Sequence, residues 1–167
     1  MIFPLYAFFS GETAANKERR LQGQIDTQLN ETGIKQATLA GKALKDIKFH
    51  KAYSSDLKRA NNTCQLIIEQ NEASDIKDVI QDPRIRERSF GNFENEMVSE
   101  FEMKAKEAGF KRWIDFTPEN GEKREVVRER VRGFFNVRIT DINPFLHKET
   151  IKYKFIIFYL GYDQERL

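Results

Sequence analysis

The sequence has few of the residues that build disulfide frameworks, metal centres or membrane spans. Its 167 residues include one cysteine, Cys64, which excludes a disulfide framework and the paired-cysteine spacing of a metal site. We therefore expect no metal. Cys64 falls in a helical pattern and is expected to be a buried thiol. The apolar run at residues 155–161 is too short to cross a bilayer.

An excess of charge of one sign is also lacking. Lysine and arginine number 28 against 26 aspartates and glutamates, and both signs are mixed along the chain, which argues against a nucleic-acid surface. The first nine residues are apolar but have no basic leader and no small-residue cleavage site, so a secretory signal is not expected. We expect one cytoplasmic domain over residues 1–167, without a nucleic-acid or membrane partner.

Apolar runs and helical patterns alternate along the chain. The run at 2–9 is continuous, which is typical of a parallel strand covered on both faces. Alternating strands and helices predict an α/β fold of three layers, with a mostly parallel, doubly wound sheet between helices. The predicted strands are 2–9, 52–54, 78–81 and 153–160, and the predicted helices are 31–46, 56–70, 95–108 and 122–138. Asn30 and Ser55 are predicted to cap the first two helices.

A polar stretch follows the first predicted strand. Its polar and glycine residues include Ser10, Gly11, Glu12, Thr13, Asn16, Gln22 and Gly23. Open α/β sheets bind ligands in loops at the carboxyl ends of their strands. We therefore expect this stretch to form part of a ligand site to which later elements of the chain return.

Two later segments carry residues suited to a phosphate ester. Cleaving such an ester needs cationic or N–H donors around the phosphoryl oxygens, a nucleophile in line and an acid for the leaving oxygen. Arg59, near the start of the second helix, is placed to grip phosphate by charge and beside the helix dipole. Glu87 and Arg88 lie in the other segment, where neighbouring arginines lower the pKa of a carboxyl unless burial or substrate charge raises it.

In order and spacing, these residues resemble the histidine phosphatases, the phosphoglycerate mutase-like superfamily. The signature positions that match are Gly11, Glu12, Thr13, Asn16, Leu21, Gln22, Gly23, Leu29 and Gly33, and residues 54–60 and 86–91 resemble two further motifs. The resemblance implies a phosphoglycerate mutase-like fold, C-terminally truncated here, and no cofactor. It implies that Glu87 is the proton donor to the leaving alcohol. It assigns substrate binding to Gly11, Asn16, Gln22, Gly23, Arg59 and Arg88.

Three positions differ from the family pattern. Phe9 stands at the arginine position, Ser10 at the nucleophilic histidine and Leu160 at the second histidine. Ser10 has no evident neighbouring base to activate its hydroxyl. The two histidines present, His50 and His147, are expected to be ordinary surface or interface residues. Because the sequence stops at Leu167, where the family continues with another helix and more sheet, the chain is interpreted as a fragment, a truncated product or a degenerate paralogue.

Within the superfamily, the finer resemblance is to the TIGAR-type fructose-2,6-bisphosphatases, over about residues 6–135. It implies a phosphorylated sugar or three-carbon phosphate as partner and leaves the oligomeric state open. Three functions fit: a degenerate family member with residual phosphate binding, a working phosphatase or mutase with an altered nucleophile, and a non-catalytic interaction protein. Positions 9, 10 and 160 favour the first, because function belongs to the site rather than to the fold.

Overall fold

The computed structural model describes residues 5–142 and 155–158, with side chains described for residues 5–137. The strands are β1 (Leu5–Phe8), β2 (Lys51–Ser54), β3 (Val79–Gln81) and β4 (Phe155–Phe158). The α-helices are α1 (Ala14–Lys17), α2 (Glu31–Ala43), α3 (Lys58–Glu69), α4 (Val98–Glu107) and α5 (Arg124–Ile142). Short 3-10 turns are η1 (Pro83–Ile85), η2 (Gly91–Phe93) and η3 (Trp113–Asp115).

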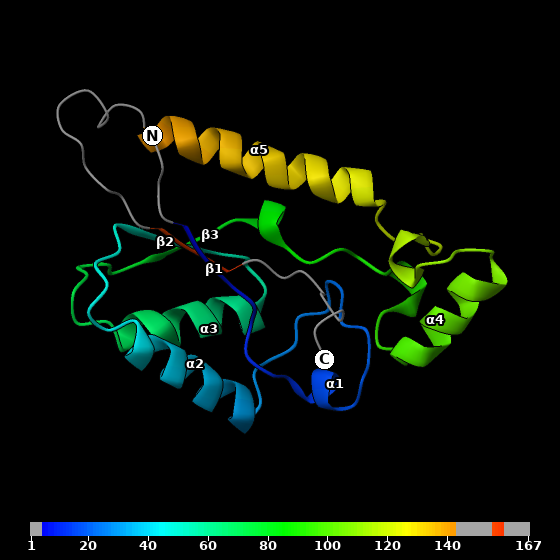
Figure 1. Ribbon diagram of the computed structural model, residues 1–167, viewed down its shortest axis with the longest axis horizontal. Helices are drawn as coiled ribbons and strands as arrows, with labels where there is room; N and C mark the ends of the chain where they lie inside the picture. The colour runs from blue at the N-terminus through cyan, green and yellow to red at the C-terminus, as the bar shows by residue number, and fades with distance from the viewer. Residues whose placement is uncertain (1–4, 143–154, 159–167) are drawn as a thin grey trace.

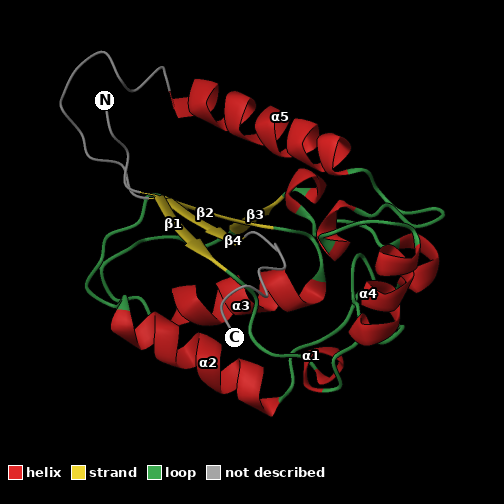
Figure 2. Cartoon of the chain, turned by 45° about the vertical axis from the view of Figure 1, so that its right-hand side comes forward, coloured by secondary structure: helices red, strands yellow, loops and turns green. Residues whose placement is uncertain are grey.

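The described strands form one parallel sheet in the order β1-β4-β2-β3. Helices α2 and α3 cover one face of this sheet, and α5 crosses the other face (Figures 1 and 2). The predicted three-layer α/β architecture with a parallel sheet is therefore confirmed. Because parallel strands share one direction, the loops that follow β1, β2 and β3 leave the sheet at the same edge.

Alternating side chains on β2 hold the layers together. Ala52 is buried toward α3, where it packs with Cys64 and Ile67. Tyr53, its neighbour, packs edge-to-face on Phe134 of α5, with ring centroids 5.5 Å apart. Successive strand residues point to opposite faces, so this one strand anchors both helical layers. The prediction that Cys64 is buried is confirmed.

A second cluster of aromatic residues packs around α4. Phe101 is fully buried there, and its ring contacts the rings of Phe90, Phe93, Trp113 and Phe116 at centroid distances of 5.3–5.8 Å. Phe90 immediately follows the segment that carries Glu87. The cluster therefore holds α4 and η3 against that segment.

The prediction that the first strand is covered on both faces is wrong for the part the structure describes. Leu5 is 47% exposed and Phe9, just after β1, is 59% exposed. The reason is the strand order, which places β1 at an edge where it pairs only with β4 among the described strands. Continuous apolar character predicts a strand but not its place in the sheet.

Element boundaries differ by a few residues from the predictions. Helix α4 begins at Val98 rather than at 95, because Asn95 has a positive φ of 72° that ends the preceding turn. Helix α3 begins at Lys58 with Leu57 at the N-cap position, so the prediction that Ser55 caps this helix is wrong. Ser55 Oγ instead accepts a hydrogen bond from Leu57 N in the turn before the helix. Helix α5 runs on to Ile142. The one-turn helix α1 and the 3-10 turns were not predicted. Both ends of the last predicted strand, including Leu160, lie outside the described residues, and so does His147.

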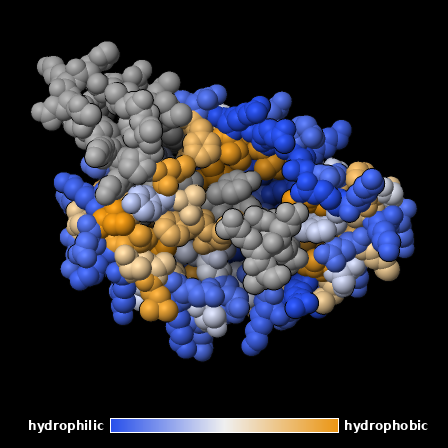
Figure 3. All heavy atoms as spheres, in the orientation of Figure 1, coloured by the Kyte–Doolittle hydropathy of each residue, from blue (hydrophilic) through white to orange (hydrophobic). Residues whose placement is uncertain are grey.

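The surface of the described residues carries both apolar and hydrophilic side chains (Figure 3). Figure 3 shows apolar side chains gathered over the sheet and below α5, with hydrophilic side chains around the rim of the molecule. No helix in the described part of the chain is both long and apolar enough to span a bilayer. Single exposed apolar side chains are ordinary on a folded protein.

The aromatic cluster predicts a large cost for truncating its central residue. Phe101→Ala should lower the free energy of unfolding by about 3–5 kcal/mol, because it removes a fully buried ring and leaves a cavity. Met103→Ala is the matched control on the same helix, since Met103 is 59% exposed; it should change stability by less than about 0.5 kcal/mol. Urea unfolding measures both. Equal losses for the two variants would contradict the described packing.

Candidate functional site

The candidate site lies where the loops after β1, β2 and β3 leave the sheet. Gly11 follows β1, Arg59 lies in the first turn of α3 after β2, and Glu87 follows η1 after β3. The structure brings these three segments together through hydrogen bonds between Arg59 and Glu87 and between Gly11 and α3. The expected convergence of the three motifs at one sheet edge is thus observed.

Arg59 is the centre of this site. Its side chain is 1% exposed, and Nη2 donates to Glu87 Oε2 at 2.9 Å and to Gly23 O at 2.7 Å. Nη1 donates to Ile25 O at 2.7 Å and lies 3.3 Å from Thr27 Oγ1. A buried guanidinium requires such partners, because removing it from water without them costs several kcal/mol. Arg59 therefore holds the 23–27 loop and Glu87 in fixed relation.

Glu87 is the acid that this site presents. Its side chain is 10% exposed. Burial raises the pKa of the Glu87 carboxyl from its ordinary 4.5 to about 7, against the lowering pull of Arg59 and with a further raising contribution from Glu94. A carboxyl that titrates near neutral pH suits a general acid.

The glycine after β1 is required by close packing. Gly11 N donates to Thr63 Oγ1 at 3.0 Å, and Thr63 Oγ1 donates to Arg59 O at 2.6 Å. A Cβ on Gly11 would collide with the backbone of Gly33 at the start of α2. The Gly11 amide, which we expected to bind substrate, is therefore occupied by α3 in this structure. Thr63 was missed as a site residue, although a polar residue beside the apolar stripe of the helix was a usable signal.

Asn16 and Gln22 form a network around Thr13. Asn16 Oδ1 accepts from Thr13 N at 2.9 Å, and Asn16 N donates to Thr13 Oγ1 at 3.2 Å, which caps α1. Gln22 Oε1 accepts from Thr13 Oγ1 at 2.8 Å and from Thr27 Oγ1 at 2.5 Å. Asn16 is exposed and Gln22 is buried. The two predicted binding residues thus shape the loop after β1, and their substrate contacts stay a prediction.

Arg88, also expected to contact substrate, binds backbone carbonyls and one threonine hydroxyl in this structure. Its guanidinium donates to the carbonyls of Glu122, Ile114 and Phe116 at 2.6–2.7 Å. It also lies 3.1 Å from Thr117 Oγ1. These bonds tie the Glu87 segment to the loop around η3. We predicted from sequence that Arg88 contacts substrate. In the structure its guanidinium links backbone segments, and a contact with substrate stays a prediction.

Ser10, which we predicted to stand at the position of the family nucleophile, is half-buried. No base is hydrogen-bonded to its hydroxyl among the residues that the structure describes. His50 is exposed and precedes β2, so it lies at the opposite edge of the sheet. Leu160, the third position that departs from the family pattern, lies outside the described residues.

Arg130 of α5 is a further residue that sequence reasoning missed. Nη1 donates to the carbonyls of Arg84 and Arg86, each at 2.7 Å, and Nη2 donates to Glu87 O at 3.0 Å. Nε and Nη2 also pair with the Glu122 carboxylate at 2.7 and 2.9 Å. The helix on the far face of the sheet thus fixes the backbone that carries Glu87. The helical periodicity of 122–138 carried no signal for this contact.

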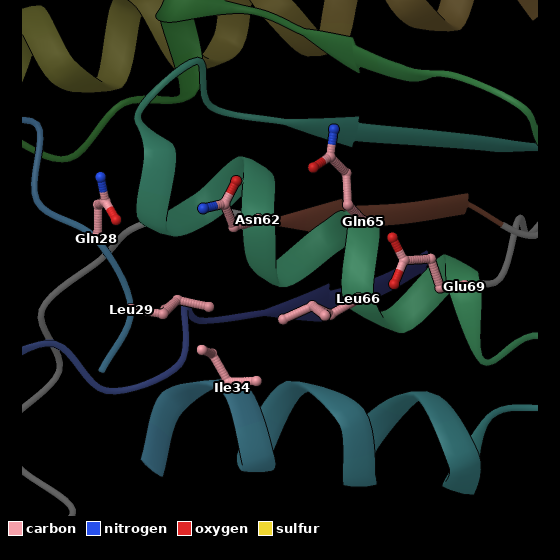
Figure 4. Close-up of a pocket in the computed structure, with 7 residues that line it drawn as sticks. All are labelled: Gln28, Leu29, Ile34, Asn62, Gln65, Leu66 and Glu69. Atoms are coloured by element: carbon pink, nitrogen blue, oxygen red, sulfur yellow. The ribbon is translucent and has the colours of Figure 1, made fainter. Parts of the chain in front are cut away.

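One cavity in the described structure is separate from these residues. It has a volume of about 260 Å³ and lies between α2 and α3 (Figure 4). Its lining residues are Gln28, Leu29, Ile34, Asn62, Gln65, Leu66 and Glu69. No predicted site residue lines it. Within the same described ranges, no cluster of histidine, cysteine or carboxylate residues is arranged to hold a metal ion.

Fold and site together define an α/β domain with a buried, arginine-paired acid at the carboxyl edge of a parallel sheet. The family model of the histidine phosphatase superfamily (branch 1) matches residues 10–144. The chain belongs to this superfamily, and the predicted family is confirmed.

Individual relatives agree with this assignment. The chain is 43% identical over 134 residues to the fructose-2,6-bisphosphatase TIGAR of Xenopus tropicalis, covering 80% of this chain and 48% of that protein. It is 33% identical over 134 residues to the phosphoglycerate mutase of Schizosaccharomyces pombe, covering 77% of this chain and 63% of that protein. The crystal structure of phosphoglycerate mutase from Bacillus anthracis superposes with a TM-score of 0.79 at 26% identity, covering 95% of this chain and 74% of that one. The chain thus spans about half the length of the TIGAR relative.

The raised pKa of Glu87 predicts a pH-dependent stability. The folded pKa of about 7 lies above the ordinary 4.5, so this contribution to stability is fully present below about pH 4.5 and is lost as the pH rises through 7. From pH 5 to pH 8, Glu87 should lower the free energy of unfolding by roughly 2 kcal/mol. Glu87→Gln, which mimics the protonated acid, should remove that part of the pH dependence. Urea unfolding of both proteins at the two pH values measures the difference.

The control for this experiment is Glu102→Gln on the exposed side of α4. It removes the same charge from a solvated position and should leave the pH dependence as in the native chain. If Glu87→Gln and the native chain lose the same stability between pH 5 and pH 8, the raised pKa is refuted.

Proposed function

We propose that this chain is a histidine phosphatase-family domain that binds phosphorylated small molecules weakly and has little or no turnover. The observation that carries the proposal is a contrast within the site. Arg59 and Glu87 are paired at the expected sheet edge, whereas Phe9 and Ser10 precede Gly11 at the family's catalytic positions. Phenylalanine has no phosphate-binding donor, and a serine hydroxyl without a base is a poor nucleophile.

The class of ligand follows from the relatives. Their names specify a fructose-2,6-bisphosphatase and a phosphoglycerate mutase, which supports a phosphorylated sugar or three-carbon phosphate as the ligand. A cytoplasmic site of action suits such metabolites. Affinity should be low, because the Arg59 guanidinium already donates to four protein oxygens.

Protonation of Glu87 should control anion binding. When the Glu87 carboxyl is ionised, it neutralises Arg59 at 2.9 Å. When it is protonated, the positive charge of Arg59 is left unbalanced in a buried setting, where electrostatic attraction is stronger than in water. An anion at this sheet edge should therefore bind better below the pKa of Glu87, about 7, than above it.

This gives a direct binding prediction. Sulfate, a dianion throughout this range, should bind up to about tenfold more tightly at pH 6 than at pH 8, because the fraction of protonated Glu87 changes by that factor. Calorimetric titration measures both affinities. In Glu87→Gln the affinity should be the same at the two pH values and close to the native value at pH 6. No binding of sulfate or of a sugar bisphosphate at millimolar concentration would favour the interaction-protein alternative.

Turnover is predicted to be negligible. Loss of a catalytic nucleophile alone can lower kcat by on the order of 10⁶. Release of phosphate from fructose-2,6-bisphosphate or 2,3-bisphosphoglycerate should be no faster with the native chain than with its Ser10→Ala variant. Phosphate release that Ser10→Ala abolishes would instead establish a working enzyme with an altered nucleophile.

That working phosphatase or mutase is the second candidate function. The observation in its favour is Glu87, whose pKa of about 7 matches the task of protonating a leaving alcohol. The two candidates share the fold and the ligand class and differ only in turnover, so the assay with Ser10→Ala separates them.

A further inference from the structure

Two segments form the walls of the candidate site, the loop 23–27 and the segment 87–90. One link between them is cationic, because Arg59 Nη2 donates both to Gly23 O at 2.7 Å and to Glu87 Oε2 at 2.9 Å. A second, neutral link comes from Gln24, whose Nε2 lies 3.2 Å from Glu87 O. Each wall is a loop without regular structure over these residues, so such cross-links set the distance between them.

Glu94 provides a third link, and it is anionic. Its Oε1 accepts from Gln24 N at 3.0 Å in the first wall, and from Ser89 Oγ at 2.9 Å and Phe90 N at 3.0 Å in the second. Hydrogen bonds to an ionised acceptor are about twice as strong as neutral ones. One carboxylate oxygen thus accepts hydrogen bonds from both walls at once.

The sequence is shaped around this carboxylate. Gly23 has φ of +53°, and a Cβ built on it would collide with the Glu94 carboxylate. Any other residue at 23 would therefore be strained in its backbone and would also displace Glu94. The glycine that we expected to contact substrate is required here by Glu94.

We propose that Glu94 is a positioning residue of this site, which fixes Glu87 relative to the Gly23–Gln24 turn and acts on Glu87 through its charge. The proposal rests on the proposed function, in which protonation of Glu87 controls anion binding, but the geometry of the cross-link does not depend on binding or turnover.

The charge of Glu94 acts in a defined direction. Arg59 and Glu94 are the charged groups that act on the Glu87 carboxyl, while Arg130 of α5 binds the Glu87 carbonyl. Burial raises the pKa of Glu87, Arg59 lowers it, and Glu94 raises it further because two negative charges repel. Glu94 therefore favours the protonated form of Glu87, the form an acid needs.

The test is the titration of Glu87 by carbon-13 NMR of its carboxyl. Glu94→Gln keeps an oxygen that accepts the three hydrogen bonds but removes the charge, so the pKa of Glu87 should fall by roughly half a unit or more. Glu96→Gln is the matched control, an exposed glutamate two residues further along, and it should leave the titration unchanged. An unchanged pKa in a folded Glu94→Gln variant overturns the proposal.

A second measurement uses the native chain and needs no variant. The amide protons of Gln24 and Phe90 both donate to Glu94, so their hydrogen exchange should be slowed together at pH 6–8. Exchange at the rate of an open loop would also overturn the proposal. The two proposals fail separately. If the native chain binds no sulfate but Glu94→Gln lowers the pKa of Glu87, the binding function is refuted and the role of Glu94 stands. If the chain binds sulfate but Glu94→Gln leaves the pKa of Glu87 unchanged, only the role of Glu94 is refuted.

Discussion

The buried guanidinium of Arg59 is the constraint on which the site depends. It is 1% exposed, and a cation removed from water is tolerated only when its donors are satisfied. Three of its acceptors come from the loop 23–27 and the fourth is Glu87. The loop therefore folds where it satisfies Arg59, and Glu87 is drawn into a buried position where its proton is held more tightly than in water. The charge that would bind a ligand is the same charge that organises the site.

Arginine performs this organising task three times in the described structure. Arg59, Arg88 and Arg130 each donate to two or more backbone carbonyls from distant parts of the chain. The planar fork of the guanidinium suits such multiple contacts, which a lysine ammonium cannot reproduce with the same geometry. Irregular segments, which lack the ladder bonds of a sheet, gain fixed positions in this way. Arg59 and Arg88 belong to the predicted binding motifs, whereas Arg130 lies outside them and fixes the backbone that carries Glu87.

Layer architecture, family and the meeting of three motifs were predictable from sequence, because they depend on local periodicity and on short motifs. The α3 pattern predicted a buried Cys64, and the order of strands and helices predicted a parallel sheet. The exposure of β1 was not predictable, since the strand order depends on long-range pairing that an apolar run does not encode. The cross-links made by Thr63, Glu94 and Arg130 were missed for the same reason: each is a polar residue in a helix or loop that binds a residue at least 43 positions away.

The edge position of β1 determines where the described sheet can be extended. Among the described strands, β1 pairs with β4, and Leu5 in β1 and Phe9 just after it are exposed. An edge strand with apolar side chains is a place where another strand can be added. A further strand that joins the described sheet beside β1 would therefore lie next to the strand that leads into the loop with Gly11.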